Sequence, residues 1–308
     1  MLYPLVKPLV QSCLRIFFSD IRVSGQTGLH QLKGPLMIVA NHPDSFLDGI
    51  AIATQCASPA YFLARGDLFR KKPLYKKILS SLHVVPVHRL SEGKDHLHEN
   101  EETFNACKAI LRNKGIVIIF IEGICVLSHE LQPFKKGTAR IVQGSWDEGV
   151  PTKVLPVGLY YETLHGVGKS LQIITGPVLS RDDFPKETVL PRQLKTFNDV
   201  LYAQINQLMK SRVPVQTNTN TFLLLLTRLL HAPVYYPISQ FIRQKTKGTV
   251  FYDSVLFGAL LLLYPWYLLL ILGLLLWLGI PFISAIIIVV LFPLTAYFSR
   301  SAVYGNKP

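Results

Sequence analysis

Short apolar runs alternate with amphipathic segments between about residues 30 and 215. Apolar runs of about four to eight residues are typical of buried strands, and apolar residues recurring at three and four positions are typical of amphipathic helices. The clearest helices are predicted over about 99–112 and 192–212. The predicted strands are Leu36–Ala40, Ala60–Ala64, His83–Val87, Ile116–Ile121, Val154–Tyr161 and Leu171–Thr175. This alternation predicts an α/β domain over 23–215, with a central mixed sheet flanked by helices.

The first residues, 1–22, show the pattern of an amphipathic helix. Lys7, Gln11 and Arg15 lie on one side, and Pro4 and Pro8 indicate that the helix begins only after them. Such a helix lies in a membrane interface or closes over a core, and the membrane interface is the prediction we adopt. The apolar side consists of Leu2, Val6, Leu9, Cys13, Ile16 and Phe17.

The C-terminal part contains no charged residue from Ser254 to Ser299. This length suits two bilayer crossings of about 20 residues each, and Gly279-Ile280-Pro281 is the natural turn between them. We therefore predict a transmembrane hairpin within 253–300, with spans at about 254–278 and 282–298. The alternative is a very apolar hairpin buried in a soluble protein.

The segment before the hairpin, 216–252, is predicted to be an interfacial linker that contains an interfacial or docking helix over 222–230. It follows Pro214, and its apolar stretch 222–230 is too short to span a bilayer and carries Arg228. The basic residues that flank the hairpin are Lys245, Lys247, Arg300 and Lys307. Because short basic flanks tend to stay in the cytoplasm, the hydrophilic domain is expected to face the cytoplasm.

The chain carries a net charge of +13 and has four cysteines. A cationic surface attracts nucleic acid, anionic lipid or phosphorylated ligands, and the apolar hairpin favours the lipid and phosphate interpretations. No nucleic-acid motif is present, so no nucleic-acid partner is predicted. The cysteines show no metal-type spacing, and His96, His98 and Glu99 belong to a charged loop expected to be solvated, so no metal site is predicted.

The stretch NHPDSFLD follows a predicted strand and places His42 near Asp44 and Asp48. An imidazole whose Nδ1–H is held by a carboxylate presents Nε2 as a general base, and the carboxylate stabilises the imidazolium that forms. A hydroxyl group is the natural proton donor to such a base. The alternative is a histidine with a purely structural role.

Other apolar strands also end in polar residues or glycine. Arg89 follows one strand, Glu122 and Gly123 follow another, and Pro156 lies within VLPVGLYYE. In an open α/β sheet the ends of such strands meet at one crevice. A guanidinium group there is suited to holding a phosphate, and the stretch LQPFKKG adds Lys135 and Lys136.

Four blocks of the chain resemble, in this order, those of the membrane-associated glycerophospholipid acyltransferases, which include lysophosphatidate and glycerol-3-phosphate acyltransferases. The blocks are NHPDSFLD, VPVHR, FIEGICVLSHELQPFKKGTARI and VLPVGL. The resemblance spans about residues 35–180. It implies that His42 and Asp48 form the catalytic dyad and that Arg89 binds the acceptor phosphate. It further implies that Glu122 and Gly123 help bind the acceptor and that Pro156 forms the site wall or contacts the acyl donor. No cofactor or metal is implied; the co-substrate is acyl-CoA or acyl carrier protein.

Two departures from the common family pattern stand out. Five residues separate His42 from Asp48 instead of four, which resembles a subgroup that includes glycerol-3-phosphate acyltransferases. Because one extra residue turns a helical side chain by about 100°, the backbone must loop for Asp48 to reach His42. Asp48 is favoured as the partner of His42, with Asp44 as the alternative; if Asp48 is the partner, Asp44 is expected to cap the following helix.

The second departure is Ile124-Cys125, which stands where the family usually has Thr-Arg. Lys135, Lys136 or Arg140 is expected to replace the missing charge. Cys125 is not expected to be a nucleophile, because nothing nearby in the sequence would lower its pKa.

The predicted activity is an O-acyltransferase of phospholipid biosynthesis that moves a fatty acyl group from a thioester to a glycerophosphate hydroxyl. Lysophosphatidate is the favoured acceptor, and glycerol 3-phosphate or dihydroxyacetone phosphate is the alternative. A different class remains open: a non-catalytic membrane scaffold that binds lipid.

Overall fold

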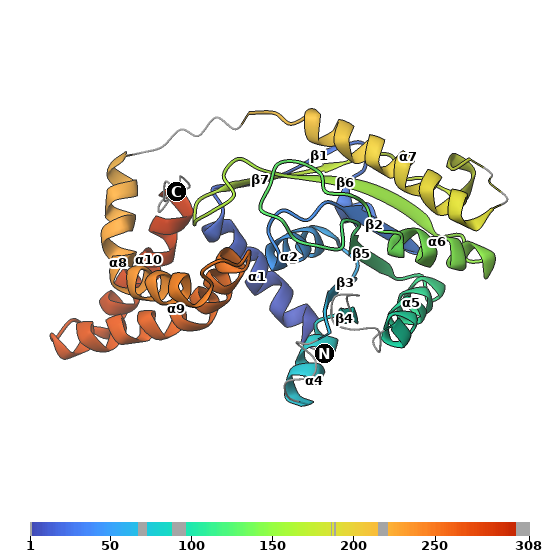
Figure 1. Cartoon of the computed structure of the whole chain (residues 1–308). Helices are drawn as coiled ribbons and strands as arrows, with labels where there is room; N and C mark the ends of the chain where they lie inside the picture. Colours follow the sequence, from blue (N-terminus) through green and yellow to red (C-terminus); the bar gives the residue numbers. More distant parts are fainter. Residues whose placement is uncertain are drawn as a thin grey trace.

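A seven-stranded mixed sheet forms the centre of the protein (Figure 1). The computed structural model describes residues 2–66, 73–87, 97–185, 187, 189–214 and 221–299. The strand order is β1-β7-β6-β2-β5-β3-β4, and only the β6–β7 pairing is antiparallel. The strands are β1 (Asp20–Gly25), β2 (Leu36–Ala40), β3 (Ala60–Arg65), β4 (Val84–Val87), β5 (Ile116–Phe120), β6 (Lys153–Tyr161) and β7 (Ser170–Thr175). The predicted mixed α/β sheet is confirmed.

Strand β1 is absent from the sequence prediction, whereas the other strands begin and end within one residue of it. Its sequence, DIRVSG, contains only two apolar residues and lies at the edge of the sheet. Four of its six positions are exposed. An edge strand of this composition gives no apolar run, so periodicity does not reveal it.

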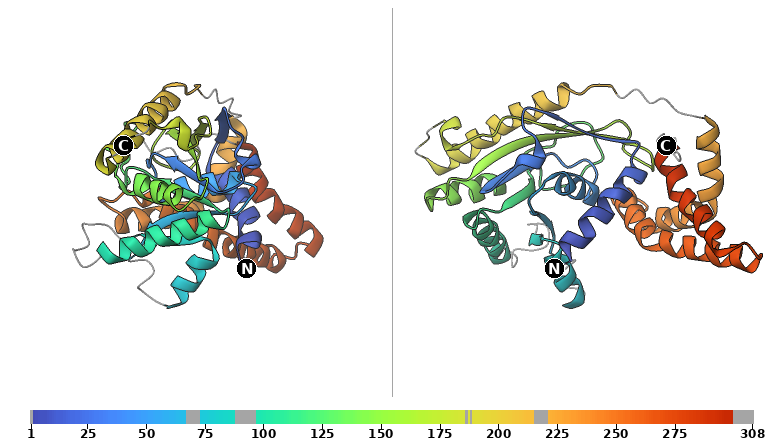
Figure 2. Two further views of the ribbon diagram at one scale, coloured as in Figure 1. Left: turned by 90° about the vertical axis from the view of Figure 1, so that its right-hand side faces the viewer. Right: turned by 180° about the vertical axis from the view of Figure 1, so that it is seen from behind.

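Helices cover both faces of the sheet (Figure 2). Helices α1 and α2 pack on one face, where the core includes Leu47, Ile52 and Leu155. Helices α5, α6 and α7 pack on the other, where the core includes Trp146 and Phe197. The helices of this domain are α1 (Tyr3–Phe17), α2 (Phe46–Gln55), α4 (Pro73–Ser81), α5 (Leu97–Arg112), α6 (Gly137–Asp147) and α7 (Leu190–Lys210), with short 3-10 helices η1 (Leu29–Gln31) and η4 (Arg181–Asp183).

Helix α1 includes both prolines of the N-terminal segment, so the expectation that it begins after them is wrong. Pro4 lies in the first turn, where the missing N–H would have no intrahelical partner. Pro8 is retained inside the helix, whose far end buries Leu14 and Phe17 in the core. The helix therefore closes over the core with its C-terminal half, while Leu5 at the other end is exposed.

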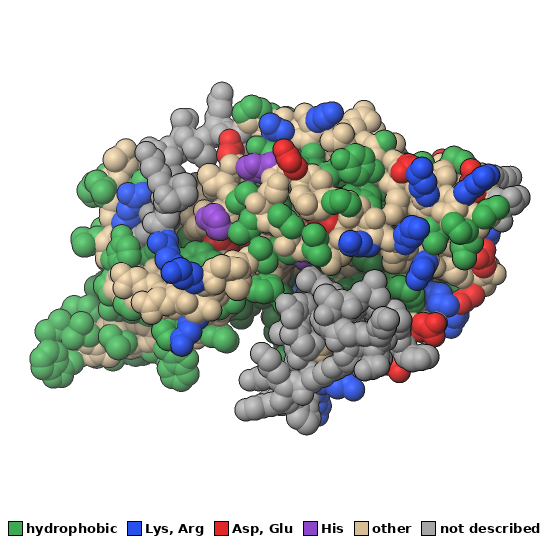
Figure 3. Space-filling view, viewed as in Figure 1, with side chains coloured by type: hydrophobic (Ala, Val, Ile, Leu, Met, Phe, Trp, Pro, Cys, Tyr) green, Lys and Arg blue, Asp and Glu red, His purple; other side chains and the backbone are tan. Residues whose placement is uncertain are grey.

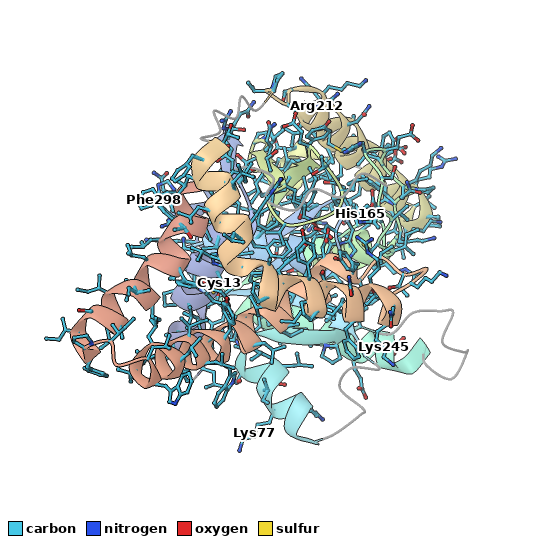
Figure 4. All side chains as sticks on the ribbon, turned by 90° about the vertical axis from the view of Figure 1, so that its left-hand side faces the viewer. Cys13, Lys77, His165, Arg212, Lys245 and Phe298 are labelled. Carbon is cyan, nitrogen blue, oxygen red and sulfur yellow. The ribbon has the colours of Figure 1, made fainter. Side chains whose placement is uncertain are left out.

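Helices α9 (Tyr252–Trp277) and α10 (Phe282–Ser299) are long and apolar enough to cross a membrane. Gly279, with φ +79°, lies in the turn between them. Their outer side chains are exposed: Trp277 is 80% and Ile283 75% exposed. Figure 3 shows hydrophobic side chains covering the end of this hairpin, and in Figure 4 Phe298 projects from the outer side of α10. Exposure of this kind does not suit a hairpin buried in a soluble protein.

Helix α8 (Thr221–Lys245) packs against α9 and α10 and is longer than the predicted stretch 222–230. It continues through Pro233 and Pro237. Contacts to α9 hold this part of the helix, because Tyr267 donates a hydrogen bond to the Leu230 carbonyl at 2.6 Å and His231 contacts the Tyr264 hydroxyl at 2.8 Å. Tertiary packing therefore overrides the helix-breaking tendency of proline.

Asn41 extends the pairing of β2 with β6 beyond the end of β2. Its side-chain Nδ2 donates to the Leu159 carbonyl at 3.0 Å, and the Leu159 N–H donates to its Oδ1 at 2.7 Å. Asn41 is buried, at 3% exposed. The side chain thus satisfies two buried backbone groups and fixes the start of the loop that carries His42.

We predict that Asn41→Ala lowers the free energy of unfolding by about 2–4 kcal/mol, because each buried backbone group left unpaired costs about 1–3 kcal/mol. The measurement is urea unfolding in detergent, followed by tryptophan fluorescence. Asn113→Ala, at an exposed position after α5, is the control and should unfold like the wild type. Equal stability of the two variants would contradict this role of Asn41.

Candidate active site

The carboxyl ends of β2, β5 and β6 meet at one edge of the sheet, because β2 lies between the other two and all three are parallel. His42 follows β2, Glu122 follows β5, and Tyr161 is the last residue of β6. The topology therefore brings together polar residues from three segments far apart in the sequence.

His42 and Asp48 form a hydrogen-bonded pair at this edge, with 2.8 Å between His42 Nδ1 and Asp48 Oδ2. Asp48 lies in the first turn of α2 and is completely buried. Its carboxylate also accepts hydrogen bonds from the Tyr161 hydroxyl at 2.7 Å and from the Asp44 backbone N–H at 2.8 Å. Because an ionised carboxylate only accepts hydrogen bonds, we assign Nδ1 of His42 as a donor.

The backbone between the pair loops as the five-residue spacing requires. Helix α2 begins only at Phe46, and Ser45 has φ 51° and ψ −128°. Asp44 does not cap this helix: its carboxylate is buried in an ion pair with Lys169. The predicted capping role of Asp44 is therefore wrong, since the side chain turns into the protein instead of toward the amides of α2.

The imidazole of His42 is held on several sides. Its ring stacks on Phe120, with 4.0 Å between ring centres and 8° between ring planes. Its backbone N–H donates to Glu122 Oε2 at 3.0 Å, and its carbonyl accepts from the Val126 N–H at 3.3 Å. The side chain is 15% exposed, and its Nε2 has no hydrogen-bond partner among the described residues. Nε2 is thus the atom that remains available to a ligand.

Glu122 braces the loop that carries His42. Its side chain is buried, and its two oxygens accept hydrogen bonds from the backbone N–H groups of His42 and Gln132, the latter at 2.9 Å. Burial raises the pKa of Glu122 above its usual value, and the two amide donors act in the opposite direction. These contacts account for a carboxylate here, whereas acceptor binding by Glu122 stays a prediction.

Gly123 and Lys135 lie side by side after β5. Gly123 has φ +65°, and a Cβ atom there would lie 2.9 Å from Cγ of Lys135. The Lys135 backbone N–H donates to the Ile121 carbonyl at 2.8 Å, and Lys136 immediately precedes α6. Both lysines are exposed, and neither forms an ion pair with a carboxylate in the described ranges. They are therefore free to bind an anion.

Pro156 lies away from the dyad. It is buried in the middle of β6, and a Cβ atom at Gly176 would lie 2.8 Å from its ring. The alternate residues of β6, Leu155 and Val157, face the α2 side, so Pro156 faces the α7 side. The structure does not bring Pro156 to His42. Arg89 lies outside the described residues.

Cys125 supports the same loop through a backbone contact. Its sulfur accepts a hydrogen bond from the Ser45 N–H at 3.0 Å. Burial, together with the nearby charge of Asp48, raises the pKa of the Cys125 thiol to about 12. The thiol therefore stays protonated near neutral pH and is not the thiolate that nucleophilic attack needs.

No group of three or more His, Cys, Asp or Glu side chains in the described part of the chain is arranged to hold a metal ion.

Sequence reasoning missed Tyr161 and Lys169. Burial and the adjacent Asp48 raise the pKa of Tyr161 well above its usual value, so its hydroxyl stays protonated and donates to Asp48. The alternation along β6 could have revealed Tyr161, because its side chain lies on the same α2-facing side of the strand as Leu155 and Val157. Lys169 stands alone between Gly168 and Ser170, and nothing in that pattern reveals that it is buried.

Comparison with known proteins finds similarity to one family over part of the chain. The model of the family described as Acyltransferase matches residues 20–160. Among solved structures, the 1-acyl-sn-glycerophosphate (LPA) acyltransferase PlsC from Thermotoga maritima is similar, with 19% identity, a TM-score of 0.47, and coverage of 68% of this chain and 81% of that one. No curated protein matches the sequence. The matched segment contains all four blocks, from His42 to Pro156, so this part of the chain is similar to the acyltransferase family.

Proposed function

We propose that the protein transfers a fatty acyl group from an acyl thioester to a hydroxyl of a glycerophosphate acceptor. The observation that carries this proposal is the 2.8 Å contact between His42 Nδ1 and Asp48, which leaves Nε2 of the same ring without a partner among the described residues. A base in this state is suited to removing a proton from an acceptor hydroxyl.

The reaction proceeds in two steps. Nε2 of His42 takes the hydroxyl proton while the hydroxyl oxygen attacks the thioester carbonyl, and Asp48 stabilises the imidazolium that forms. The tetrahedral intermediate then collapses, the carbon–sulfur bond breaks, and the leaving thiolate takes the proton from His42. The products are an ester and a free thiol, with no acyl-enzyme intermediate. The protonated state of Cys125 supports this direct transfer.

The acceptor phosphate is assigned to the basic groups after β5 and to Arg89. Lys135 and Lys136 are exposed, and the side chain of Lys135 packs against Gly123. Arg140, on the first turn of α6, is also exposed and is a further candidate for the missing charge of the third block. Binding of the phosphate holds the acceptor hydroxyl close to His42, and this positioning raises the rate of the chemical step.

Lysophosphatidate is the acceptor we favour, with phosphatidate as the product; glycerol 3-phosphate or dihydroxyacetone phosphate is the alternative suggested by the five-residue spacing. The donor is acyl-CoA or acyl carrier protein. Both a long-chain thioester and a lysolipid partition into a bilayer, so an enzyme anchored by α9 and α10 meets both substrates. The catalytic domain faces the cytoplasm in this proposal, in accordance with the basic flanks of the hairpin.

A non-catalytic lipid-binding scaffold is the competing function. Such a scaffold needs apolar and basic surface but has no use for a buried carboxylate that orients an imidazole. The contacts of Asp48 therefore favour the enzyme over the scaffold.

We predict that His42→Ala lowers acceptor-dependent thiol release by about 10²–10⁴-fold, the usual contribution of a positioned general base. The measurement follows free thiol from palmitoyl-CoA in the presence of lysophosphatidate and, in parallel, glycerol 3-phosphate. His30→Ala, at an exposed position in η1, serves as the matched control and should keep the wild-type rate.

The better acceptor in this assay identifies the step in lipid synthesis. If His42→Ala retained the wild-type rate, the assigned base would be wrong. If the wild type released no thiol with either acceptor, and none with acyl carrier protein as donor, the scaffold function would take precedence.

We predict that Cys125→Ser retains acyl transfer within about threefold, because a serine hydroxyl can accept the same hydrogen bond from Ser45 and no thiolate takes part. In the native wild type, Cys125 should also react slowly with iodoacetamide at pH 8, since its pKa of about 12 keeps it protonated. Unfolded protein supplies the reference rate. Loss of activity in Cys125→Ser with rapid alkylation of the native thiol would instead indicate covalent catalysis.

A further inference from the structure

Three charged side chains are buried together beside the dyad: Asp44, Lys169 and Asp253, none more than 2% exposed. We refer to them as the buried charge cluster. The ammonium group of Lys169 forms ion pairs with Asp44 and with Asp253, the latter at 2.6 Å. Asp253 also accepts the Gly166 N–H at 3.1 Å. The cluster joins three segments, which are the loop after β2, the loop before β7, and the first turn of α9.

Burial of charge on this scale is costly, and apolar side chains of similar size often stabilise a core equally well. Burial raises the pKa of Asp44 well above its usual range, with Lys169 acting in the opposite direction. Burial lowers the pKa of Lys169, but the two carboxylates raise it by more. Directional pairs fix the relative positions of the segments that carry them, which nonspecific apolar contact does not.

One end of the cluster is part of the loop that carries the dyad. Asp44 is separated from His42 by a single residue, and its backbone N–H donates to the Asp48 carboxylate at 2.8 Å. Because Lys169 holds the side chain of Asp44, it also restrains the backbone group that orients Asp48. Lys169 thus acts on the dyad through Asp44, without touching His42.

The other end of the cluster belongs to the apolar hairpin. Ser254 follows Asp253 on α9; its hydroxyl accepts the Leu47 N–H at 3.3 Å and donates to the Asp44 carbonyl at 3.4 Å. The next turn of α9 inserts Leu256 and Phe257 into the core. Two neighbouring residues at the start of the hairpin therefore hold the loop between His42 and Asp48 by side-chain and backbone contacts.

We propose that Lys169 and Asp253 are positioning residues through which the C-terminal hairpin fixes the loop that carries His42 and Asp48. In this arrangement the hairpin contributes to acyl transfer as well as to membrane attachment. The inference rests on the proposed acyltransferase function for its kinetic consequence, whereas its structural consequence is independent of that function.

The test compares full-length wild type with Asp253→Asn, both in lipid nanodiscs. This variant keeps the shape of the side chain and the ion pair between Lys169 and Asp44, so it removes only the charge on the hairpin. The first readout is amide hydrogen–deuterium exchange of 42–48, compared with that of 116–120 in β5. The second is kcat and KM for acyl transfer from palmitoyl-CoA.

In Asp253→Asn we expect exchange of 42–48 to become at least about tenfold faster, with exchange of 116–120 unchanged. We expect kcat to fall about tenfold and KM for the thioester to change by less than about twofold, because misplacement of a catalytic group affects the chemical step more than binding. Lys108→Met is the matched control: it breaks the Lys108–Glu148 ion pair on the opposite face of the sheet and should leave both readouts at wild-type values.

A second comparison keeps the test valid if single variants fold poorly. Lys169→Met leaves two buried carboxylates near each other, and Lys169→Met/Asp253→Asn removes one of them. If the cluster positions the dyad, the double variant should recover part of the kcat and of the protection from exchange that Lys169→Met loses.

Unchanged exchange and kcat in Asp253→Asn would overturn the proposal. Faster exchange of 42–48 and 116–120 to the same extent would also overturn it, by indicating a merely structural cluster. If the wild type proved inactive, the proposed function would fail, and the exchange of 42–48 would still decide whether the hairpin fixes this loop.

Discussion

The carboxylate of Asp48 accepts three hydrogen bonds inside the protein, from the imidazole of His42, the hydroxyl of Tyr161 and the backbone of Asp44. A fully buried carboxylate is tolerated only when such donors replace its hydration. The three donors come from the loop after β2 and from the end of β6, so Asp48 can be satisfied only when these segments are correctly placed. The geometry of His42 follows from this requirement, since its Nδ1 must point at Asp48.

The surrounding elements each restrict the same short loop. Asn41 joins its start to β6, Glu122 holds the backbone of His42, and Phe120 supports the imidazole ring. Ser254, which belongs to α9, forms hydrogen bonds with the end of the loop that leads into α2. Polar groups at the ends of three parallel strands thus form a rigid support for one imidazole, in which a single ring nitrogen is left for a substrate. Such preorganisation is what a general base requires.

Much of this arrangement was predictable from sequence, and the exceptions have physical causes. Apolar runs in β2, β5 and β6 and the uncharged stretch of α9 and α10 gave strong periodic or compositional signals. The proximity of His42 to Asp48 required only a loop between them. Strand β1 was missed because an edge strand can be polar. Helix α8 was predicted too short because packing permits Pro233 inside a helix. The ion pairs of the buried charge cluster could not be predicted, since Asp44, Lys169 and Asp253 are far apart in the sequence. The apolar pattern along a strand or helix indicates which of its faces is buried, but not which buried charged side chains form ion pairs with one another.

Replacement of Asp48 by asparagine tests most directly whether it orients His42 as a general base. Asparagine has nearly the same shape but cannot supply the charge that stabilises an imidazolium or two accepting oxygens for the three donors. The measurement is kcat and KM of purified Asp48→Asn for acyl transfer from palmitoyl-CoA, alongside its thermal midpoint. We predict that kcat falls by about 10³–10⁴-fold, as for loss of the orienting carboxylate in other histidine-based sites, with little change in KM for the thioester. A folded Asp48→Asn variant with a wild-type kcat would contradict this prediction.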